Sequence, residues 1–406
     1  MSLVPFEEAL DRLLRDAASV VETEKGGLVD AFGRILAQDL VARRTQPAFD
    51  ASAMDGYALR AADLALLPAE FSVIGESSAG HAFAGEVGPG KAVRIFTGAP
   101  LPQGADTVVI QENTEAADEG RVRVIEPAVE GANIRRAGND FSEGDTLLPA
   151  GTALGPAPCA LAASAGYGSV EVRRRPRVAL AATGDELVAP GTLPGPAQTV
   201  ASNSLAIAMI VRAAGGEVLD LGIVPDRREA LAAAFAEARA RGADVLVTIG
   251  GASVGDHDLV GPVLKAEGAA LDFWKVAMRP GKPLMAGALG PMRILGLPGN
   301  PASSLVTAEL FLRPLVERLA GRKTAARRRR GLLAASVKAN DHRTDFLRAT
   351  IERGVDDALP RIAPLDRQDS SLLTVFARAK VLLVRPAHAP AGRIGDECEY
   401  VALTPG

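Results

Sequence analysis

The middle of the chain alternates short apolar runs with amphipathic stretches. The runs Arg177 to Ala182, Glu217 to Val224 and Asp244 to Ile249 have the length and composition of buried strands. Between the last two, residues 228–241 are predicted to form a helix that places apolar side chains along one face: Ala230, Leu231, Ala234, Phe235 and Ala238. Another helix is predicted from Ser202 to the Gly215-Gly216 pair. This alternation predicts a doubly wound parallel α/β sheet with helices on both faces.

The flanking regions have other patterns. Residues 1–44 begin with a helical stripe after Pro5, formed by Phe6, Ala9, Leu10, Leu13 and Leu14. Residues 45–144 are rich in glycine and in short alternating runs, which predict β-structure. Beyond residue 331, apolar runs predict a small β-barrel-like domain. We therefore predict a multidomain α/β plus β protein with four parts: a helical and β linker domain at 1–44 and about 145–175, a β-rich domain at 45–144, the α/β domain at 176–326 and the β-barrel-like domain at 331–406.

Composition narrows the possible functions. With 406 residues and 48% hydrophobic residues, the chain is long enough for several cores. Its net charge of −4 argues against general nucleic-acid binding, and the basic run Arg327 to Arg330 is predicted to be a solvated linker. The N-terminal segment is acidic and no run of about 20 apolar residues occurs, so we expect no signal peptide and no membrane span. Cys159 and Cys398 have no metal-binding spacing, and we expect reduced thiols in a cytoplasmic protein.

The loop after the strand at 244–249 combines backbone donors with carboxylates. Its sequence is GGASVGDHD, in which Gly250, Gly251 and Gly255 permit a tight turn with exposed amides and Ser253 adds a hydroxyl. Such a turn is suited to phosphate oxygens, although it is also common in plain loops. Two carboxylates follow at once, Asp256 and Asp258. They would repel a phosphate unless a cation such as Mg²⁺ lay between them, and capping of the next helix is their alternative role.

Two other loops of the predicted sheet carry further carboxylates. Thr183-Gly184-Asp185-Glu186 follows the strand at 177–182, and Pro225-Asp226 follows the strand at 217–224. Ligands of such sheets bind at the carboxyl ends of the strands. We therefore expect Glu186, Asp226, Asp256 and Asp258 to lie at one edge as candidate metal ligands.

Cations and a rigid turn complete the predicted edge. Three cations lie within eight residues about the end of the strand predicted at 270–278, namely Lys275, Arg279 and Lys282, and the Pro280-Gly281 turn points them at a loop end. The turn Pro298-Gly299-Asn300-Pro301 has a backbone fixed by two prolines, so that Asn300 either points inward or caps the next helix. The sequence thus predicts a polyanion held together with a metal ion.

These motifs resemble those of the molybdopterin molybdenumtransferase (MoeA) family, which includes the homologous part of gephyrin. The similar motifs in the sheet region are TGDEL, PD, GGASVGDHD, RPGKP and GLPGNP. Upstream, PAFDASAMDGYALR (Pro47 to Arg60), FTGAPLPQGADTVVIQE (Phe96 to Glu112) and RRAGND (Arg135 to Asp140) resemble the same family in the same order. The resemblance covers nearly the whole chain.

The resemblance implies a reaction, cofactors and partners. Molybdate would be inserted into the dithiolene of adenylylated molybdopterin with release of AMP, assisted by Mg²⁺ or another divalent cation. It also implies an elongated homodimer, a molybdopterin adenylyltransferase that supplies the substrate, and molybdoenzyme maturation proteins that receive the product.

Site roles follow from the matching positions. Catalytic residues would be Asp55, Asp140, Glu186, Asp226, Asp258, Lys275 and Arg279. Substrate and phosphate would be bound by Thr97, Thr183, Gly184, Asp185, Ser202, Asn203, Gly250, Gly251, Ser253, Gly255, Lys282, Pro298, Gly299, Asn300, Pro301, Ser303 and Ser370. We expect the molybdate pocket near Arg279, Ser303 and the Pro298 to Pro301 turn. Asp55 and Asp140 also have a plain reading as turn residues.

The sequence departs from the family at a few positions. Arg279 stands where some members have lysine, and Arg227 stands where a second aspartate is common. Ser370 lies in a segment that is usually richer in glycine. Two other functions remain as alternatives: a molybdopterin adenylyltransferase, which would leave Asp55 and Asp140 without a task, and a non-enzymatic scaffold of the gephyrin kind.

Overall fold

A computed structural model describes residues 3–15, 17–118, 120–251, 258–322, 327–352 and 359–403. The chain forms two compact units. Unit 1 contains residues 1–24, 33–35 and 173–406, and unit 2 contains residues 25–32 and 36–172. The chain passes between the units within strands β2 (Thr23–Gly27) and β13 (Ser169–Arg173). The four-part division predicted above stays a prediction.

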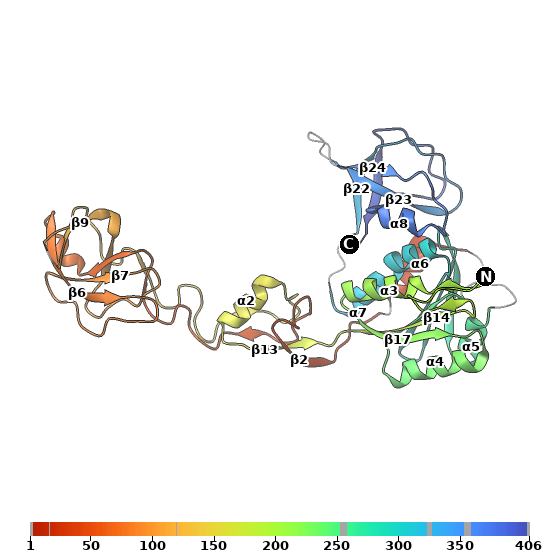
Figure 1. Ribbon diagram of the computed structural model, residues 1–406, viewed down its shortest axis with the longest axis horizontal. Coiled ribbons are helices and arrows are strands. Elements are labelled where there is room, and N and C mark those ends of the chain that lie inside the picture. Colours follow the sequence, from red (N-terminus) through yellow and green to blue (C-terminus); the bar gives the residue numbers. More distant parts are fainter. Residues whose placement is uncertain are drawn as a thin grey trace. The chain divides into compact units, whose positions relative to one another are not determined.

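The core of unit 1 is an α/β sheet (Figure 1). Strands β17, β14, β18 and β21 lie in this order and are parallel, and the antiparallel β20 and then β19 extend the sheet. The strands are β14 (Arg177–Thr183), β17 (Glu217–Val224), β18 (Val245–Ile249), β19 (Ala270–Arg279), β20 (Pro283–Leu289) and β21 (Met292–Leu297), with the short β1 (Val4–Pro5) beside β19.

Helices cover both faces of this sheet, as the sequence predicted. One face is covered by α4 (Arg228–Ala240) and α5 (Val260–Ala266). The buried side chains of α4 are Leu231, Ala234, Phe235 and Ala238, which belong to the predicted stripe. The other face is covered by α1 (Phe6–Arg15), α3 (Ser202–Ala213), α6 (Pro301–Thr307), the π-helical turn η3 (Ala308–Leu312) and α7 (Arg313–Leu319).

The C-terminal part of unit 1 is a closed five-stranded barrel, which confirms the predicted barrel-like fold. Around the ring, β22 pairs with β24, β24 with β23, β23 with β25, β25 with β26 and β26 with β22. Its elements are β22 (Arg328–Leu333), β23 (Thr344–Glu352), β24 (Arg361–Pro364), α8 (Leu373–Arg378), β25 (Val381–Arg385) and β26 (Glu397–Ala402). A parallel pairing joins β23 to the end of β19, so the barrel continues the sheet.

The prediction of a solvated linker at Arg327 to Arg330 is wrong. Three of these residues belong to strand β22, and the side chains of Arg327, Arg328 and Arg330 are ion-paired. Arg328 pairs with Glu7 and Glu399, and Arg330 pairs with Glu397. Arg327 binds the buried carboxylate of Glu309 at 2.7 Å. Opposite charges on the adjacent strand and helices make a basic run compatible with a barrel strand.

Unit 2 is built mainly from strands. Its six-stranded sheet has the order β8, β5, β7, β6, β10, β9, and two short pairs are formed by β11 with β4 and by β12 with β3. The elements are β3 (Leu40–Val41), β4 (Ala51–Ser52), β5 (Gly56–Leu59), η1 (Ala61–Leu64), β6 (Ala69–Ser77), β7 (Lys91–Ile95), β8 (Thr107–Ile110), η2 (Gln111–Asn113), β9 (Thr114–Ala116), β10 (Arg121–Val124), β11 (Ile134–Arg135), β12 (Thr146–Leu148) and α2 (Pro156–Ser164).

In unit 1, the remaining strands β15 (Leu187–Val188) and β16 (Thr199–Val200) pair beside the sheet. Across the described ranges, no helix is long and apolar enough to cross a membrane.

Candidate active site

A cavity of about 590 Å³ lies in unit 1 at the carboxyl ends of the parallel strands. Strands β14, β17, β18 and β21 each end at this edge, so loops that are far apart in the sequence meet there. The predicted site residues that line the cavity are Thr183, Glu186, Ser202, Asn203, Asp226, Gly250, Gly251, Pro298, Gly299, Asn300 and Pro301.

The floor of the cavity requires glycine beside Thr183. Gly250 and Gly251 both have positive φ, at 96° and 61°, a conformation that other residues rarely adopt. A Cβ atom on Gly250 would lie 2.7 Å from the carbonyl oxygen of Thr183. The Thr183 hydroxyl itself is buried and has no hydrogen-bond partner within the described part of the chain. Because an unpaired buried hydroxyl is costly, it is available to a ligand oxygen.

Three carboxylates of the predicted set lie close together here. The backbone N–H of Asp226 donates to Oδ1 of Asp185 at 3.2 Å, which joins the loops after β14 and β17. Loss of hydration raises the pKa of Asp226, and the charges of Asp185 and Glu186 raise it further. Like charges at one cavity wall are unfavourable without a cation.

Asp258 is the most strongly perturbed acid of this edge. Its Oδ1 accepts a hydrogen bond from the N–H of Val260 at 3.1 Å, so it does cap the start of α5. Its other oxygen, Oδ2, is buried and has no partner among the described residues. Burial raises its pKa to about 6, and the charge of Asp226 contributes. Capping therefore uses only one of its two oxygens.

The carboxylates suit a divalent cation. No three His, Cys, Asp or Glu side chains of the described ranges already converge as a metal cage. Mg²⁺ does not require three protein ligands, because it keeps several water ligands and binds through one or two carboxylates together with substrate phosphates. The unpaired Oδ2 of Asp258 and the raised pKa of Asp226 fit such a site. Asp256, Ser253 and Gly255 were also predicted here, and they lie outside the described residues.

The perturbed pKa of Asp258 predicts a pH-dependent stabilisation by Mg²⁺. A raised carboxyl pKa means that the folded protein loses stability as pH rises from the unfolded pKa, near 4, to about 6. A bound cation removes this loss, so Mg²⁺ should raise Tm more at pH 7.5 than at pH 5. Thermal unfolding at both pH values, with and without Mg²⁺, measures the effect. In Asp258→Asn the difference between the two pH values should shrink, and an equal Mg²⁺ effect at both pH values in the wild type would contradict the assignment.

The turn from Pro298 to Pro301 lies beside Gly250 and also lines the cavity. Asn203 donates through Nδ2 to the carbonyl oxygen of Gly299 at 2.8 Å, and its Oδ1 is buried without a described partner. Asn300 makes no side-chain cap of α6; its Nδ2 lies 3.2 Å from the Ser370 hydroxyl of the barrel. The Ser370 carbonyl accepts from Ala302 N–H at 2.9 Å. The barrel therefore touches the cavity wall at Ser370, while Ser303 is buried within α6.

The three predicted cations occupy different positions. Lys275 lies within β19, and Lys282 lies in the turn before β20, where its carbonyl accepts from Val276 N–H at 3.0 Å. Arg279 ends β19 and lines a second cavity, of about 390 Å³, between the sheet and the barrel. Pro283 is the residue of this segment that lines the first cavity.

Unit 2 contains the remaining predicted residues. Oδ1 of Asp55 accepts from the N–H of Thr97 at 2.7 Å and from its hydroxyl at 2.8 Å, and these bonds lower the pKa of Asp55. Asp140 is exposed, and its N–H donates to the carbonyl of Gln46 at 3.0 Å. Asp55 therefore makes the contacts expected of a turn residue, which is its alternative role. These contacts use Oδ1 and leave Oδ2 available.

The upstream motifs converge within unit 2. Strand β4 pairs with β11, and the carbonyl of Ser52 accepts from Gly98 N–H at 2.8 Å. Asp50 also joins them, because its carboxylate accepts from Ala137 N–H at 2.8 Å and from Arg136 Nη1 at 2.6 Å. Asp55, Thr97 and Asp140 thus lie on loops that contact one another.

The sequence did not single out Arg348, which lines the second cavity. It is 1% exposed, its Nη2 donates to the carbonyl of Asp369 at 2.9 Å, and its Nε has no partner within the described ranges. An arginine in the apolar run FLRAT was the available signal, since a buried charge inside a strand requires a partner.

Family models match most of the chain in three consecutive segments. Residues 4–166 match the MoeA N-terminal region (domain I and II), residues 179–318 a probable molybdopterin binding domain, and residues 330–403 the MoeA C-terminal region (domain IV).

Curated relatives and solved structures agree with these matches. The molybdopterin molybdenumtransferase of Haemophilus influenzae is 38% identical over 321 residues, 79% of each chain, and that of Bacillus subtilis is 35% identical over 395 residues, 94% of this chain and 90% of the relative. A crystal structure of a molybdopterin biosynthesis MoeA protein from Pyrococcus horikoshii has a TM-score of 0.81 and 30% identity, with 100% of both chains covered.

Proposed function

Since this chain belongs to the molybdopterin molybdenumtransferase (MoeA) family, whose members insert molybdenum in molybdenum cofactor biosynthesis, we propose that its substrate is adenylylated molybdopterin. The protein is a transferase. In the proposed reaction the two dithiolene sulfurs bond to the molybdenum of molybdate, and one oxide leaves as water with the two thiol protons. A further water adds across the pyrophosphate link. One phosphate of the link leaves as part of AMP, and the other phosphate stays on the pterin.

The observation that carries the proposal is the set of unsatisfied polar atoms around one cavity. The Thr183 hydroxyl and the Asn203 Oδ1 are buried and unpaired within the described ranges, and both residues line a space of about 590 Å³. In the Gly250-Gly251 turn the N–H of Gly250 already donates to the Leu297 carbonyl at 3.1 Å, so Gly251 would supply the further backbone donor. Hydroxyl, amide and carbonyl groups arranged in this way suit the oxygens and ring edges of a phosphorylated heterocycle.

A divalent cation would be held by Glu186, Asp226 and Asp258, with Asp256 in the same loop. It would neutralise charge on the pyrophosphate oxygens as the link breaks. Asp258 already binds the α5 N-terminus through Oδ1, which fixes the direction of its free Oδ2. Asp185 holds the backbone of Asp226 and so keeps the loops after β14 and β17 in register.

Molybdate, a dianionic substrate, requires cations and donors beside the pterin site. The proposed binding residues are Arg279, which lines the second cavity, and Ser303 with the Pro298 to Pro301 turn, which lines the first. Lys275 and Lys282 add positive charge to the same segment as Arg279. Ser370 contributes through Asn300, to which its hydroxyl is bound.

A homodimer would give the acids of unit 2 a role. We propose that Asp55, Thr97 and Asp140 of one protomer act at the cavity of its partner, because their loops already converge in unit 2. A cytoplasmic location, supply by a molybdopterin adenylyltransferase and delivery to molybdoenzyme maturation proteins belong to the same proposal.

The test is AMP release from adenylylated molybdopterin by the purified full chain, with molybdate and Mg²⁺ each present or omitted. Release that depends on both ions supports the proposal. Pyrophosphate release from ATP in the presence of molybdopterin would instead support the adenylyltransferase alternative, and no turnover of either substrate would support the scaffold.

A further inference from the structure

The second cavity lies between the end of the sheet and the barrel, and four of its lining residues are basic. Arg279 comes from the end of β19, whereas Lys338, Arg348 and Arg385 come from the barrel. The acid that lines this cavity is Asp345. The way in which these charges pair decides which of them can meet a ligand.

Asp345 binds the guanidinium of Arg279 through both of its oxygens. Nε of Arg279 donates to Oδ1 at 2.8 Å, and Nη2 donates to Oδ2 at 2.8 Å. The parallel pairing of β19 with β23 places the two residues directly opposite each other. The Asp345 side chain is 12% exposed, whereas that of Arg279 is 47% exposed. A fixed carboxylate thus holds an accessible cation.

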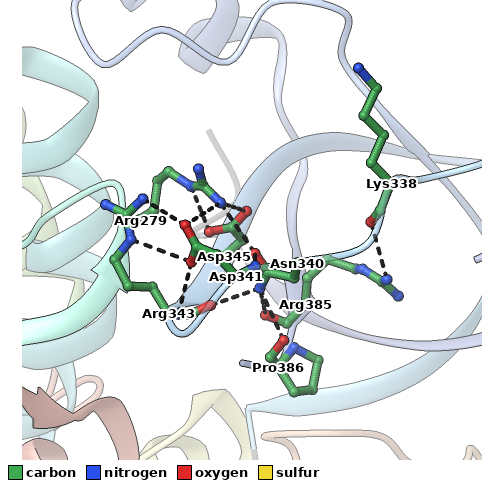
Figure 2. Close-up of polar contacts among 8 residues, drawn as sticks. All are labelled: Arg279, Lys338, Asn340, Asp341, Arg343, Asp345, Arg385 and Pro386. Carbon is green, nitrogen blue, oxygen red and sulfur yellow. Dashed lines mark hydrogen bonds and ion pairs between the residues drawn. The ribbon is translucent and has the colours of Figure 1, made fainter. Parts of the chain in front are cut away.

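Asn340 supports the same guanidinium from a second direction (Figure 2). Its Oδ1 accepts from Nη2 of Arg279 at 3.2 Å. Its Nδ2 donates to three carbonyl oxygens at 2.7–2.9 Å, those of Arg343, Arg385 and Pro386. These bonds tie the side chain of Asn340 to two segments of the barrel, so its Oδ1 has a fixed direction.

A second carboxylate, Asp341, is already occupied by Arg343. Nη2 of Arg343 donates to Oδ2 of Asp341 at 2.9 Å, and the N–H of Arg343 donates to Oδ1 at 2.9 Å. Arg279 lies farther away, at 3.6 Å from Oδ2. Asp345 is therefore the main partner of Arg279.

One nitrogen of Arg279 remains available. Within the described part of the chain, Nε and Nη2 make all of its hydrogen bonds, and Nη1 makes none. A guanidinium is planar, so fixing two of its nitrogens also fixes the direction of the third. A lysine here would have a single nitrogen and would lose this property.

We propose that Asp345 is a positioning residue, which holds Arg279 so that Nη1 is presented to the molybdate oxyanion. The inference rests on the proposed function, because molybdate is the anion assigned to Arg279. Asp345 does not touch the substrate. It reduces the freedom of a long cationic side chain before the anion arrives, and this lowers the cost of binding.

The test compares Asp345→Asn with the wild type in molybdate-dependent AMP release and in calorimetric titration with molybdate alone. The apparent KM for molybdate should rise about tenfold, while the KM for adenylylated molybdopterin stays unchanged. Removal of a negative charge near an anion site would, by itself, strengthen molybdate binding. Weaker binding therefore reports lost positioning, and a KM within about twofold of the wild type, or a lower KM, would overturn the proposal.

Further variants separate positioning from folding and from the overall function. Arg279→Lys should weaken molybdate binding to a similar degree, and combining it with Asp345→Asn should add little further loss. Glu397→Gln breaks an exposed barrel ion pair and should leave both KM values unchanged. If the wild type itself neither binds molybdate nor releases AMP, the proposed function fails, whereas a normal wild type with an unaffected Asp345→Asn refutes the positioning role alone.

Discussion

Replacing Asp226 with asparagine is expected to lower the rate of AMP release by about 100-fold or more. Asp226 lies at the end of β17, lines the main cavity and is electrostatically coupled to Asp185, Glu186 and Asp258. Asparagine keeps the shape and removes the charge that would hold a divalent cation against the pyrophosphate. The measurement is kcat for AMP release at saturating molybdate and Mg²⁺, together with Mg²⁺ titration.

A control for this variant lies on β17, the strand that precedes Asp226. Asp220 of β17 is exposed, and its Oδ1 accepts from the N–H of Gly222 at 2.8 Å, away from the cavity. Asp220→Asn should retain wild-type kcat. Near-normal release by Asp226→Asn at all Mg²⁺ concentrations would mean that this carboxylate has no part in the reaction.

Truncating Phe311 to alanine is expected to lower the free energy of unfolding of unit 1 by about 3–5 kcal/mol. Phe311 is 0% exposed in η3, and its ring packs edge-on against Phe6 of α1 with centroids 5.2 Å apart. The Phe6 ring also packs against Phe346 of the barrel at 4.8 Å. These three rings join α1, the π-helical turn η3 and the barrel strand β23, so no single small shift can fill the cavity that the truncation leaves.

The single tryptophan makes this measurement specific. Trp274 belongs to β19 in unit 1, so its fluorescence during urea unfolding reports that unit alone. Phe49 of unit 2 is 46% exposed, and Phe49→Ala should leave the urea midpoint of the Trp274 fluorescence transition unchanged. A loss below about 1 kcal/mol in Phe311→Ala would indicate that the aromatic group does not hold these elements together.

The sequence predicted elements best where one periodicity dominated. The stripe on residues 228–241 matches the buried face of α4, because a helix against a sheet must bury one side. Charges were harder to interpret. Arg328 and Arg330 belong to a strand because acids on β26 and α1 neutralise them, and no local pattern reveals partners that far away in the chain.

The same limit applied to the candidate site. Loops at strand ends were expected to meet, and the loops of Thr183, Asp226 and Gly250 do line one cavity. The bond between Asn203 and Gly299, the buried Arg348 and the contacts of Arg279 with the barrel were not predicted. The first joins α3 to the turn after β21, whereas the other two depend on how the barrel is built and joined to the sheet; all three involve residues separated by tens of positions in the chain.

The contact of Ser370 with the turn at Asn300 and Ala302 has a consequence for how the protein tolerates change. One wall of the main cavity is contacted from outside by the barrel. We therefore expect substitutions in the barrel that never touch a bound substrate to change its affinity, and we expect a fragment that ends before residue 327 to lack this support. The α/β sheet and the C-terminal barrel should accordingly be kept together in any shortened form of the protein.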